Sequence, residues 1–181
     1  MSRLRRAAPR TLAALCAVAV AAPTVAVGAT ATKPTTKPHS ILASRLLWAT
    51  VDVCSPADQR NTIGVRGSMP GNGVTGEEMF MRFTIQYRDA STGKWLALSG
   101  NADSGYIDVG SARYRARQAG RSFVFEPAAH QPAYRLRGYV YFQWRRGGKV
   151  VISAARPTQL GHRSAAGADP PSYSASTCII P

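Results

Sequence analysis

The sequence predicts an all-β protein, an antiparallel β-sandwich of about seven or eight strands. The strongest observation lies in residues 134–155, where apolar and polar side chains alternate until Gly147-Gly148 and a second apolar run follows. Period-two alternation is typical of a half-buried antiparallel strand, and a glycine pair between two such runs predicts a hairpin. Turn-forming residues also recur roughly every eight to twelve positions, and after the N-terminal region no segment of about twelve residues keeps helical spacing.

Residues 1–29 have the composition of a secretory signal peptide: a basic start, an apolar run and small residues at its end. Cleavage is expected after Ala29, with Ala31 as the alternative, and Arg5-Arg6 leaves twin-arginine export open beside the general route. The apolar run is about 16 residues long and contains Pro23, whereas a membrane-spanning helix needs about 20 apolar residues. We therefore expect a secreted, extracellular product with no transmembrane segment after cleavage.

The rest of the chain divides by composition into three parts. Residues 30–41 are rich in Thr, Pro and Lys, and predict an extended linker. Residues 42–163 carry the alternating segments and predict one β-sandwich domain, in a chain long enough to bury about 70% of its unfolded surface. Residues 164–181 are mostly polar and predict a C-terminal tail that only a disulfide bond would hold.

Two cysteines, Cys54 and Cys178, remain beyond the signal segment. In an exported chain two cysteines most simply form one disulfide bond, and two free thiols are the alternative. The chain-entropy argument gives such a bond up to about 5 kcal/mol for loops of about 100 residues or more. The sequence therefore predicts a Cys54–Cys178 bond.

The predicted elements follow one another with short turns between them. They are a strand over 47–54, a short strand at 63–65, a long surface loop formed by the Gly-rich segment 64–78, strands over 79–88, 95–98 and 106–109, a strand or loop edge over 113–117, a strand over 121–125, and the hairpin. The glycine spacing of 64–78 fits neither a P-loop nor a dinucleotide fingerprint, so a surface loop is preferred to a ligand loop. If 113–117 forms a strand, Arg113, Arg115 and Arg117 share one face.

The long strands are expected to form the core with alternate side chains. The expected inner set is Met81, Phe83, Ile85, Val140, Phe142 and Trp144. A shift of one residue would bury arginines, whose unpaired charges are too costly to desolvate. In the hairpin, a two-residue loop would pair Trp144 with Val151 and a three-residue loop would pair it with Ile152. The second is preferred because it turns Val150 and Ile152 inward.

Two stretches resemble strands of immunoglobulin-like and fibronectin type III-like domains. Residues 79–98, MFMRFTIQYRDASTGKWLAL, are similar to the central hairpin, and residues 134–154, YRLRGYVYFQWRRGGKVVISA, to the penultimate and final strands. Tyr134 stands where such domains place a tyrosine at the start of the penultimate strand. The resemblance covers residues 46–155 and implies an immunoglobulin-like sandwich that serves as a binding or structural module. The cysteines depart from the antibody pattern, so their bond is expected to be a terminal clasp.

The chain is strongly basic, with a formal net charge of +14 at pH 7. About +10 remains without residues 1–29, and Glu126 is the only acid between Arg113 and Arg163. Arginine offers forked donors to carboxylate or phosphate, and tyrosine offers a flat ring for stacking. The outward side of the central strand is therefore the candidate polyanion-binding site, and ordinary solvated surface is the alternative. Its residues are Arg135, Arg137, Tyr139, Tyr141 and Arg145.

The sequence gives no positive case for an enzyme. Asp103-Ser104-Gly105 and His130 faintly echo serine proteases, but the histidine follows the serine and the flanking glycines are wrong. The histidines are scattered and no calcium-loop or zinc spacing occurs, so neither metal nor cofactor is expected. We expect a non-catalytic binding or structural module that contacts acidic cell-envelope polymers or another extracellular protein, and binds nucleic acid only nonspecifically. The alternative is a small secreted enzyme or enzyme inhibitor, which a polar cleft with converging titratable groups would distinguish.

Overall fold

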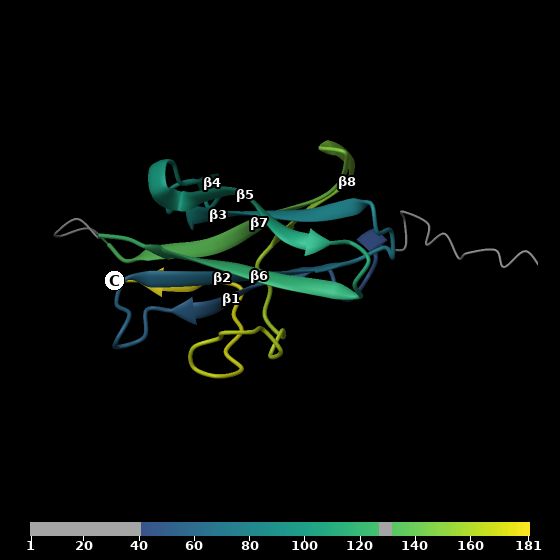
Figure 1. Ribbon diagram of the computed structural model, residues 1–181. Coiled ribbons are helices and arrows are strands. Elements are labelled where there is room, and N and C mark those ends of the chain that lie inside the picture. Colours follow the sequence, from purple (N-terminus) through teal and green to yellow (C-terminus); the bar gives the residue numbers. More distant parts are fainter. Residues whose placement is uncertain (1–40, 127–131) are drawn as a thin grey trace, which may run out of the picture. The chain divides into compact units, whose positions relative to one another are not determined.

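The structure, a computed structural model, describes residues 41–126 and 132–181 (Figure 1). The chain divides into two units, residues 1–34 and 35–181, and everything described belongs to the second. The expected signal peptide with its cleavage sites, nearly all of the expected linker, and His130 lie outside the described residues. Within the described ranges, no helix is long and apolar enough to cross a membrane.

Two antiparallel sheets face each other, as the all-β prediction requires (Figure 1). The small sheet has the order β1-β2-β6, and the large sheet has β3 and β7 at its centre. The small sheet consists of β1 (Trp48–Cys54), β2 (Thr62–Pro70) and β6 (Ala116–Val124). The large sheet consists of β3 (Glu77–Arg88), β4 (Trp95–Ala97), β5 (Asp103–Ser111), β7 (Tyr134–Arg146), β8 (Lys149–Pro157) and β9 (Cys178–Ile180). A 3-10 helix, η1 (Gly100–Ala102), precedes β5.

Six strands occupy only four positions across the large sheet. One edge of β3 pairs with β7, and the other edge is shared by β5 near its start and β4 near its end. In the same way, β8 and β9 share the edge of β7 that faces away from β3. This arrangement places β4, β5 and the long strands β3 and β7 side by side on one continuous outer face.

The core lies between the sheets and contains every residue of the expected inner set. Met81, Phe83, Ile85, Val140, Phe142 and Trp144 each have 0% of their surface exposed. The small sheet supplies the opposite side of the core through Val51, Ile63 and Val65, which are equally buried. The Trp144 indole donates a hydrogen bond to the Pro70 carbonyl at 3.0 Å, so its polar atom is satisfied inside the core.

Gly138 lets the two sheets approach closely. It lies on the inner face of β7, where a Cβ atom would stand only 2.6 Å from both methyl groups of Val65 on β2. Real Cβ atoms do not approach carbon that closely, because interiors are already close-packed. The absence of a side chain at this position therefore sets the local spacing between β2 and β7.

The hairpin has the expected register but not the expected loop. Trp144 pairs with Ile152, while Arg146 pairs with Lys149 and leaves a two-residue Gly147-Gly148 loop. The extra residue is Val151, which is absorbed by a bulge in β8 opposite the step from Trp144 to Arg145 instead of lengthening the turn. The prediction that Val150 faces inward is wrong, since half of its surface (50%) is exposed.

The Gly-rich segment 64–78 is mostly not a loop. Residues 64–70 belong to β2, and β3 already begins at Glu77. Gly64 lies in β2 at a position where only glycine fits, because a Cβ atom there would stand 2.7 Å from both Val53 and the Asp52 carboxylate. The glycine therefore serves close packing between β1 and β2. Chain reversal is confined to residues 71–76.

The second arginine face does not form. Residues 112–115 turn between β5 and β6, and β6 begins at Ala116, five residues before the expected strand. Arg113, Arg115 and Arg117 therefore do not lie on one strand. Alternation failed here because β6 is an edge strand with exposed residues on both faces, so its composition carries little periodicity.

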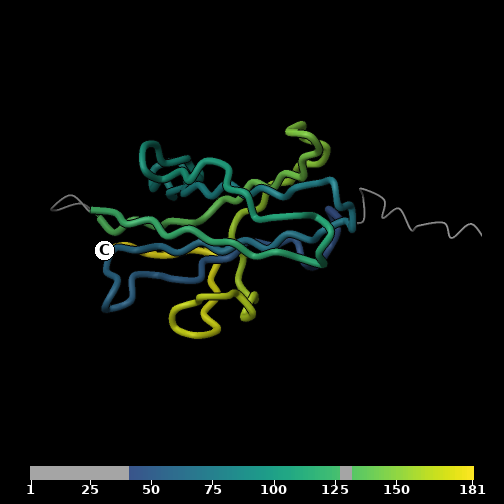
Figure 2. Tube along the Cα trace, viewed as in Figure 1, coloured from purple at the N-terminus to yellow at the C-terminus, as the bar shows by residue number. Residues whose placement is uncertain are grey.

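The C-terminal tail is held by more than the disulfide bond. Residues 158–177 pass from β8 to the outer side of β1 and then lead into β9, which pairs with β7 (Figure 2). Val51 and Ala175 exchange backbone hydrogen bonds of 2.9 and 3.0 Å, and the Asp169 amide donates to the Asp52 carbonyl at 2.8 Å. The tail also covers outward side chains of β1, since Thr50 and Asp52 are buried and the Thr50 hydroxyl lies 2.7 Å from that of Ser174. Alternation alone would have left these side chains exposed.

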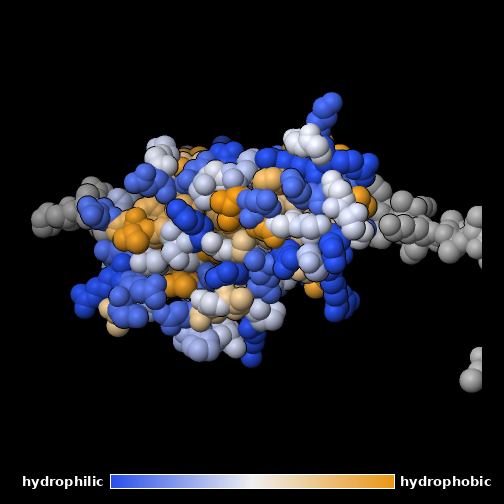
Figure 3. Space-filling model, viewed as in Figure 1, coloured by the Kyte–Doolittle hydropathy of each residue, from blue (hydrophilic) through white to orange (hydrophobic). Residues whose placement is uncertain are grey.

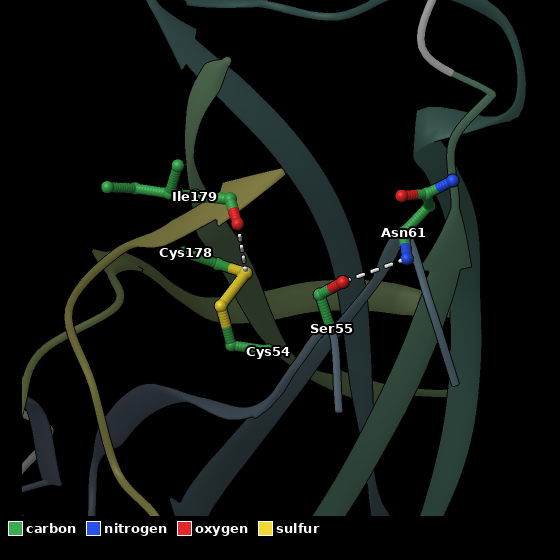
Figure 4. Close-up of a disulfide and its surroundings, with 5 residues drawn as sticks. All are labelled: Cys54, Ser55, Asn61, Cys178 and Ile179. Atoms are coloured by element: carbon green, nitrogen blue, oxygen red, sulfur yellow. Dashed lines mark hydrogen bonds between the residues drawn. A yellow bond between two sulfur atoms is a disulfide. The ribbon is translucent and has the colours of Figure 1, made fainter. Parts of the chain in front are cut away.

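The Cys54–Cys178 disulfide bond is present, with the two Cα atoms 5.4 Å apart (Figure 4). Cys54 ends β1 in the small sheet, and Cys178 begins β9 in the large sheet. The bond thus joins the two sheets of the sandwich as well as fastening the C-terminal segment.

Stability is expected to fall as the pH drops through about 6.5, because of His162. Its ring stacks on Trp48 with centroids 4.5 Å apart, and burial lowers the pKa of His162 below its usual 6.5. Below about pH 6.5 His162 is protonated more readily in the unfolded chain than in the folded chain, so acid favours unfolding. Melting temperatures at pH 7.5 and 5 should differ less for His162→Phe than for the unaltered protein. An equal pH dependence in both would contradict the assignment.

Candidate functional site

The outward side of β7 faces solvent beside the outward side of β3, which the sequence did not place there. The register sets Arg145 opposite Glu78, Tyr141 opposite Arg82, and Arg137 opposite Gln86. We call this surface the arginine–aromatic face. Its members are Phe80, Arg82, Gln86 and Arg88 of β3, Trp95 of β4, Tyr106 of β5, and Arg135, Arg137, Tyr139, Tyr141, Gln143 and Arg145 of β7.

Arginine side chains on this face lie over aromatic rings. The guanidinium carbon of Arg137 is 4.3 Å from the centre of the Trp95 ring, and that of Arg88 is 5.6 Å from it. Arg145 lies 4.1 Å from the Phe80 ring, and Arg82 lies 5.5 Å from the Tyr141 ring. Such cation–π contacts fix long side chains that would otherwise be mobile, so the donors are ordered before any ligand arrives.

Glutamine side chains orient two of these arginines without neutralising them. Arg137 Nε donates to Gln86 Oε1 at 2.8 Å, and Arg145 donates to Gln143 Oε1 through Nε (2.9 Å) and Nη2 (2.7 Å). Gln143 in turn donates to the Tyr106 hydroxyl at 2.8 Å. An amide oxygen accepts a hydrogen bond but carries no net charge, so both guanidiniums keep their full electrostatic attraction for an anion.

Arg82 is the arginine of this face that has a carboxylate partner. Its guanidinium forms a salt bridge with Asp103 at the start of β5. The hydrogen bond from Arg82 lowers the pKa of the Asp103 carboxyl, and both side chains remain partly exposed. An exposed pair of this kind contributes little to stability, but it removes Arg82 from the positive charge available to a ligand.

The two candidate tyrosines are half-buried and contact each other. Tyr139 and Tyr141 meet edge to face, with ring centres 5.2 Å apart. Since Arg82 also lies over Tyr141, the rings form part of the packed face and do not project separately. Stacking of these rings on a ligand stays a prediction.

Seven of the residues that form this face were missing from the candidate site read from the sequence. They are Phe80, Arg82, Gln86, Arg88, Trp95, Tyr106 and Gln143. The alternation of residues 79–88 does turn Arg82 and Arg88 outward, but it does not say which strand lies beside β3. The missing signal was the β3–β7 register, which depends on contacts between distant residues.

The residues that echo serine proteases have structural partners. The Ser104 hydroxyl donates to the Gly105 carbonyl at 2.7 Å and accepts from the Phe83 amide at 2.9 Å. Asp103 forms a salt bridge with Arg82. In the part of the chain that is described, no group of three or more His, Cys, Asp or Glu side chains is placed to hold a metal ion.

Two open surface hollows of similar size are lined by residues that do not belong to the arginine–aromatic face. One, of about 340 Å³, is lined by the C-terminal segment around Arg163 and Tyr173. The other, of about 350 Å³, lies between the start of β5 and the end of β6, around Asp103 and Arg121. Figure 3 shows hydrophilic residues over most of the side in view, with smaller hydrophobic groups between them.

No protein-family model matches the chain, and no curated protein matches it significantly.

Proposed function

We propose that this protein is a secreted, non-catalytic module of immunoglobulin-like architecture that binds acidic polymers at the cell envelope. The observation that carries the proposal is the arginine–aromatic face, where guanidiniums are held over rings and by neutral amides. Forked donors fixed in advance bind carboxylate or phosphate at a lower entropic cost than mobile side chains do.

Three further features support the proposal. The high positive charge attracts polyanions over long range. The large sheet has β3 and β4 beside β7, and immunoglobulin-like domains likewise have their central hairpin beside the penultimate strand, which supports the architectural part of the proposal. A disulfide bond between the sheets is a typical device of exported domains, which agrees with the signal-like N-terminus.

Binding to an acidic polymer is expected to weaken as salt is added and when Arg135, Arg137 and Arg145 are changed to glutamine. For three ionic contacts, a fourfold rise in salt should lower affinity on the order of tenfold or more, because bound counterions are released on association. The measurement is a salt titration of binding to polygalacturonate for the unaltered protein and the R135Q/R137Q/R145Q variant. The variant should bind more weakly and show a shallower salt dependence.

The matched control is R60Q/R115Q/R121Q, which removes the same charge from exposed residues outside this face. It should keep most of the affinity, apart from a small long-range loss. If retention is indifferent to salt and to both sets of changes, the proposed function is wrong. If both triple variants lose affinity equally, net charge and not the face is responsible.

A further inference from the structure

The arginine–aromatic face has two ends that differ in how well their charges are compensated. Near Tyr106, Arg82 is paired with Asp103, and Arg145 lies opposite Glu78 in the strand register. At the other end, Arg88 on β3 and Arg137 on β7 both lie over Trp95. We call Gln86, Arg88, Trp95, Arg135 and Arg137 the Trp95 cluster.

The Trp95 cluster concentrates positive charge. Tyr87 pairs with Leu136, so the next residues in the same register, Arg88 and Arg135, lie opposite each other. Arg137 pairs with Gln86 and therefore lies diagonal to Arg88. Like charges across neighbouring strands destabilise a sheet. Burial lowers the pKa of Arg137 and the nearby Arg88 lowers it further, although Tyr139 acts in the opposite direction. Among residues 41–126 and 132–181, none of the three arginines forms a salt bridge.

Asp89, the acid nearest to this cluster along the chain, forms its hydrogen bonds within the turn that follows β3. The Asp89 carboxylate accepts hydrogen bonds from the Ser91 hydroxyl and the Thr92 amide, both at 2.7 Å. It also accepts from the Thr92 hydroxyl, whose hydrogen bond contributes most to lowering the pKa of Asp89. The carboxylate is therefore committed to the turn between β3 and β4.

Donors remain available in this cluster. Arg137 uses Nε to reach Gln86, which leaves the two Nη groups of its fork, and Arg88 forms no side-chain hydrogen bond within the described residues. Gln86 and Trp95 hold the Arg137 guanidinium, while Trp95 also contacts that of Arg88. Two forks held around one ring form a receptor for an anion with at least two acceptor oxygens.

We propose that the Trp95 cluster is the oxyanion-binding subsite of this face, in which Arg88 and Arg137 bind a carboxylate or phosphate group carried by an acidic polysaccharide-like polymer. The inference rests on the proposed function and narrows it to one end of the face. A nucleic acid fits less well, because base stacking needs an accessible aromatic face and the Trp95 ring already carries two guanidiniums. The anion, and not a base, is what this cluster recognises.

The test compares two pairs of substitutions that remove equal charge from the same face. R88Q/R137Q should weaken binding of the full chain to polygalacturonate by about tenfold or more, because the loss of even one charge-assisted contact is worth about that much. R82Q/R145Q should weaken it by a clearly smaller factor, because Arg82 already has a carboxylate partner in Asp103 and only Arg145 is lost as a free donor. Titration calorimetry gives the affinities, and melting curves confirm that both variants are folded.

A third variant, R88K/R137K, tests whether binding needs the two forked donors of each guanidinium or only its positive charge. Lysine keeps the charge but donates from a single nitrogen, so this variant should also lose most of the affinity. Poly(glycerol phosphate) replaces polygalacturonate in a second arm and distinguishes phosphate from carboxylate as the preferred group. Neutral dextran should not bind.

The outcomes separate the two proposals. Equal weakening by R88Q/R137Q and R82Q/R145Q, or full retention by R88K/R137K, would overturn the subsite while leaving polymer binding in place. Tighter binding of duplex DNA than of either polymer would overturn the assignment of the ligand. Failure of the unaltered protein to bind any acidic polymer would instead remove the proposed function itself.

Discussion

Truncation of Phe83 or Phe142 to alanine is expected to lower the free energy of unfolding by about 3–5 kcal/mol. Both side chains have 0% of their surface exposed, and they lie on adjacent strands, where Met81 pairs with Phe142 and Phe83 pairs with Val140. The β3–β7 ladder is paired along its length and fixes both backbones. The cavity left by a lost ring can therefore close only partly, and its cost adds to the lost burial.

Urea denaturation followed by tryptophan fluorescence measures this effect. The control is Val124→Ala on β6, because Val124 is 70% exposed and its truncation should change stability by less than about 0.5 kcal/mol. If both phenylalanine variants are as stable as the unaltered protein, the inner and outer faces of the large sheet have been exchanged.

Loss of the Cys54–Cys178 bond is expected to cost up to about 5 kcal/mol, an amount comparable with the total stability of many domains. The bond spans 124 residues in sequence, so its removal frees a long loop in the unfolded chain. It also joins β1 to β9, so the C-terminal segment should loosen from the outer side of β1. The paired replacement C54A/C178A removes the bond without leaving a free thiol.

Two measurements check this prediction. Thiol labelling of the unreduced, denatured protein, read by peptide mapping, should find neither Cys54 nor Cys178 modified. Hydrogen exchange should show faster exchange at the Val51 and Ala175 amides in C54A/C178A than in the unaltered protein, because these amides pair the tail with β1. Labelling of both cysteines would contradict the bond, and unchanged exchange would mean that the tail is held without it.

The arginine–aromatic face carries the residues of the proposed binding site on a packed sheet. Its inner side chains fill the core, so the outer positions of β3 and β7 are free to carry charge and aromatic rings. Because the outer rows run in register, a side chain on one strand lies beside its partner on the next, and arginine meets tryptophan or tyrosine across the ladder. A rigid sheet then holds the donors more firmly than a loop would.

The sequence by itself determined the fold class and the two faces of the long strands. Alternation at Phe83 and Phe142 has a period of two, and the opposite choice would bury arginines, so one solution is physically acceptable. The prediction of the disulfide bond needed only the expected export and the two cysteines beyond residues 1–29. These features are local, or are forced by a large energetic penalty.

The tertiary structure alone decided which strands are neighbours. Arg88, Trp95 and Arg137 are brought together by two strand pairings, and no local pattern specifies a pairing partner. The bulge beside Trp144 and the burial of Asp52 beneath the C-terminal segment also depend on contacts between distant parts of the chain. The physical reason is that alternation fixes only which side of a strand is buried. The register and the covering segments follow from how all the elements pack together.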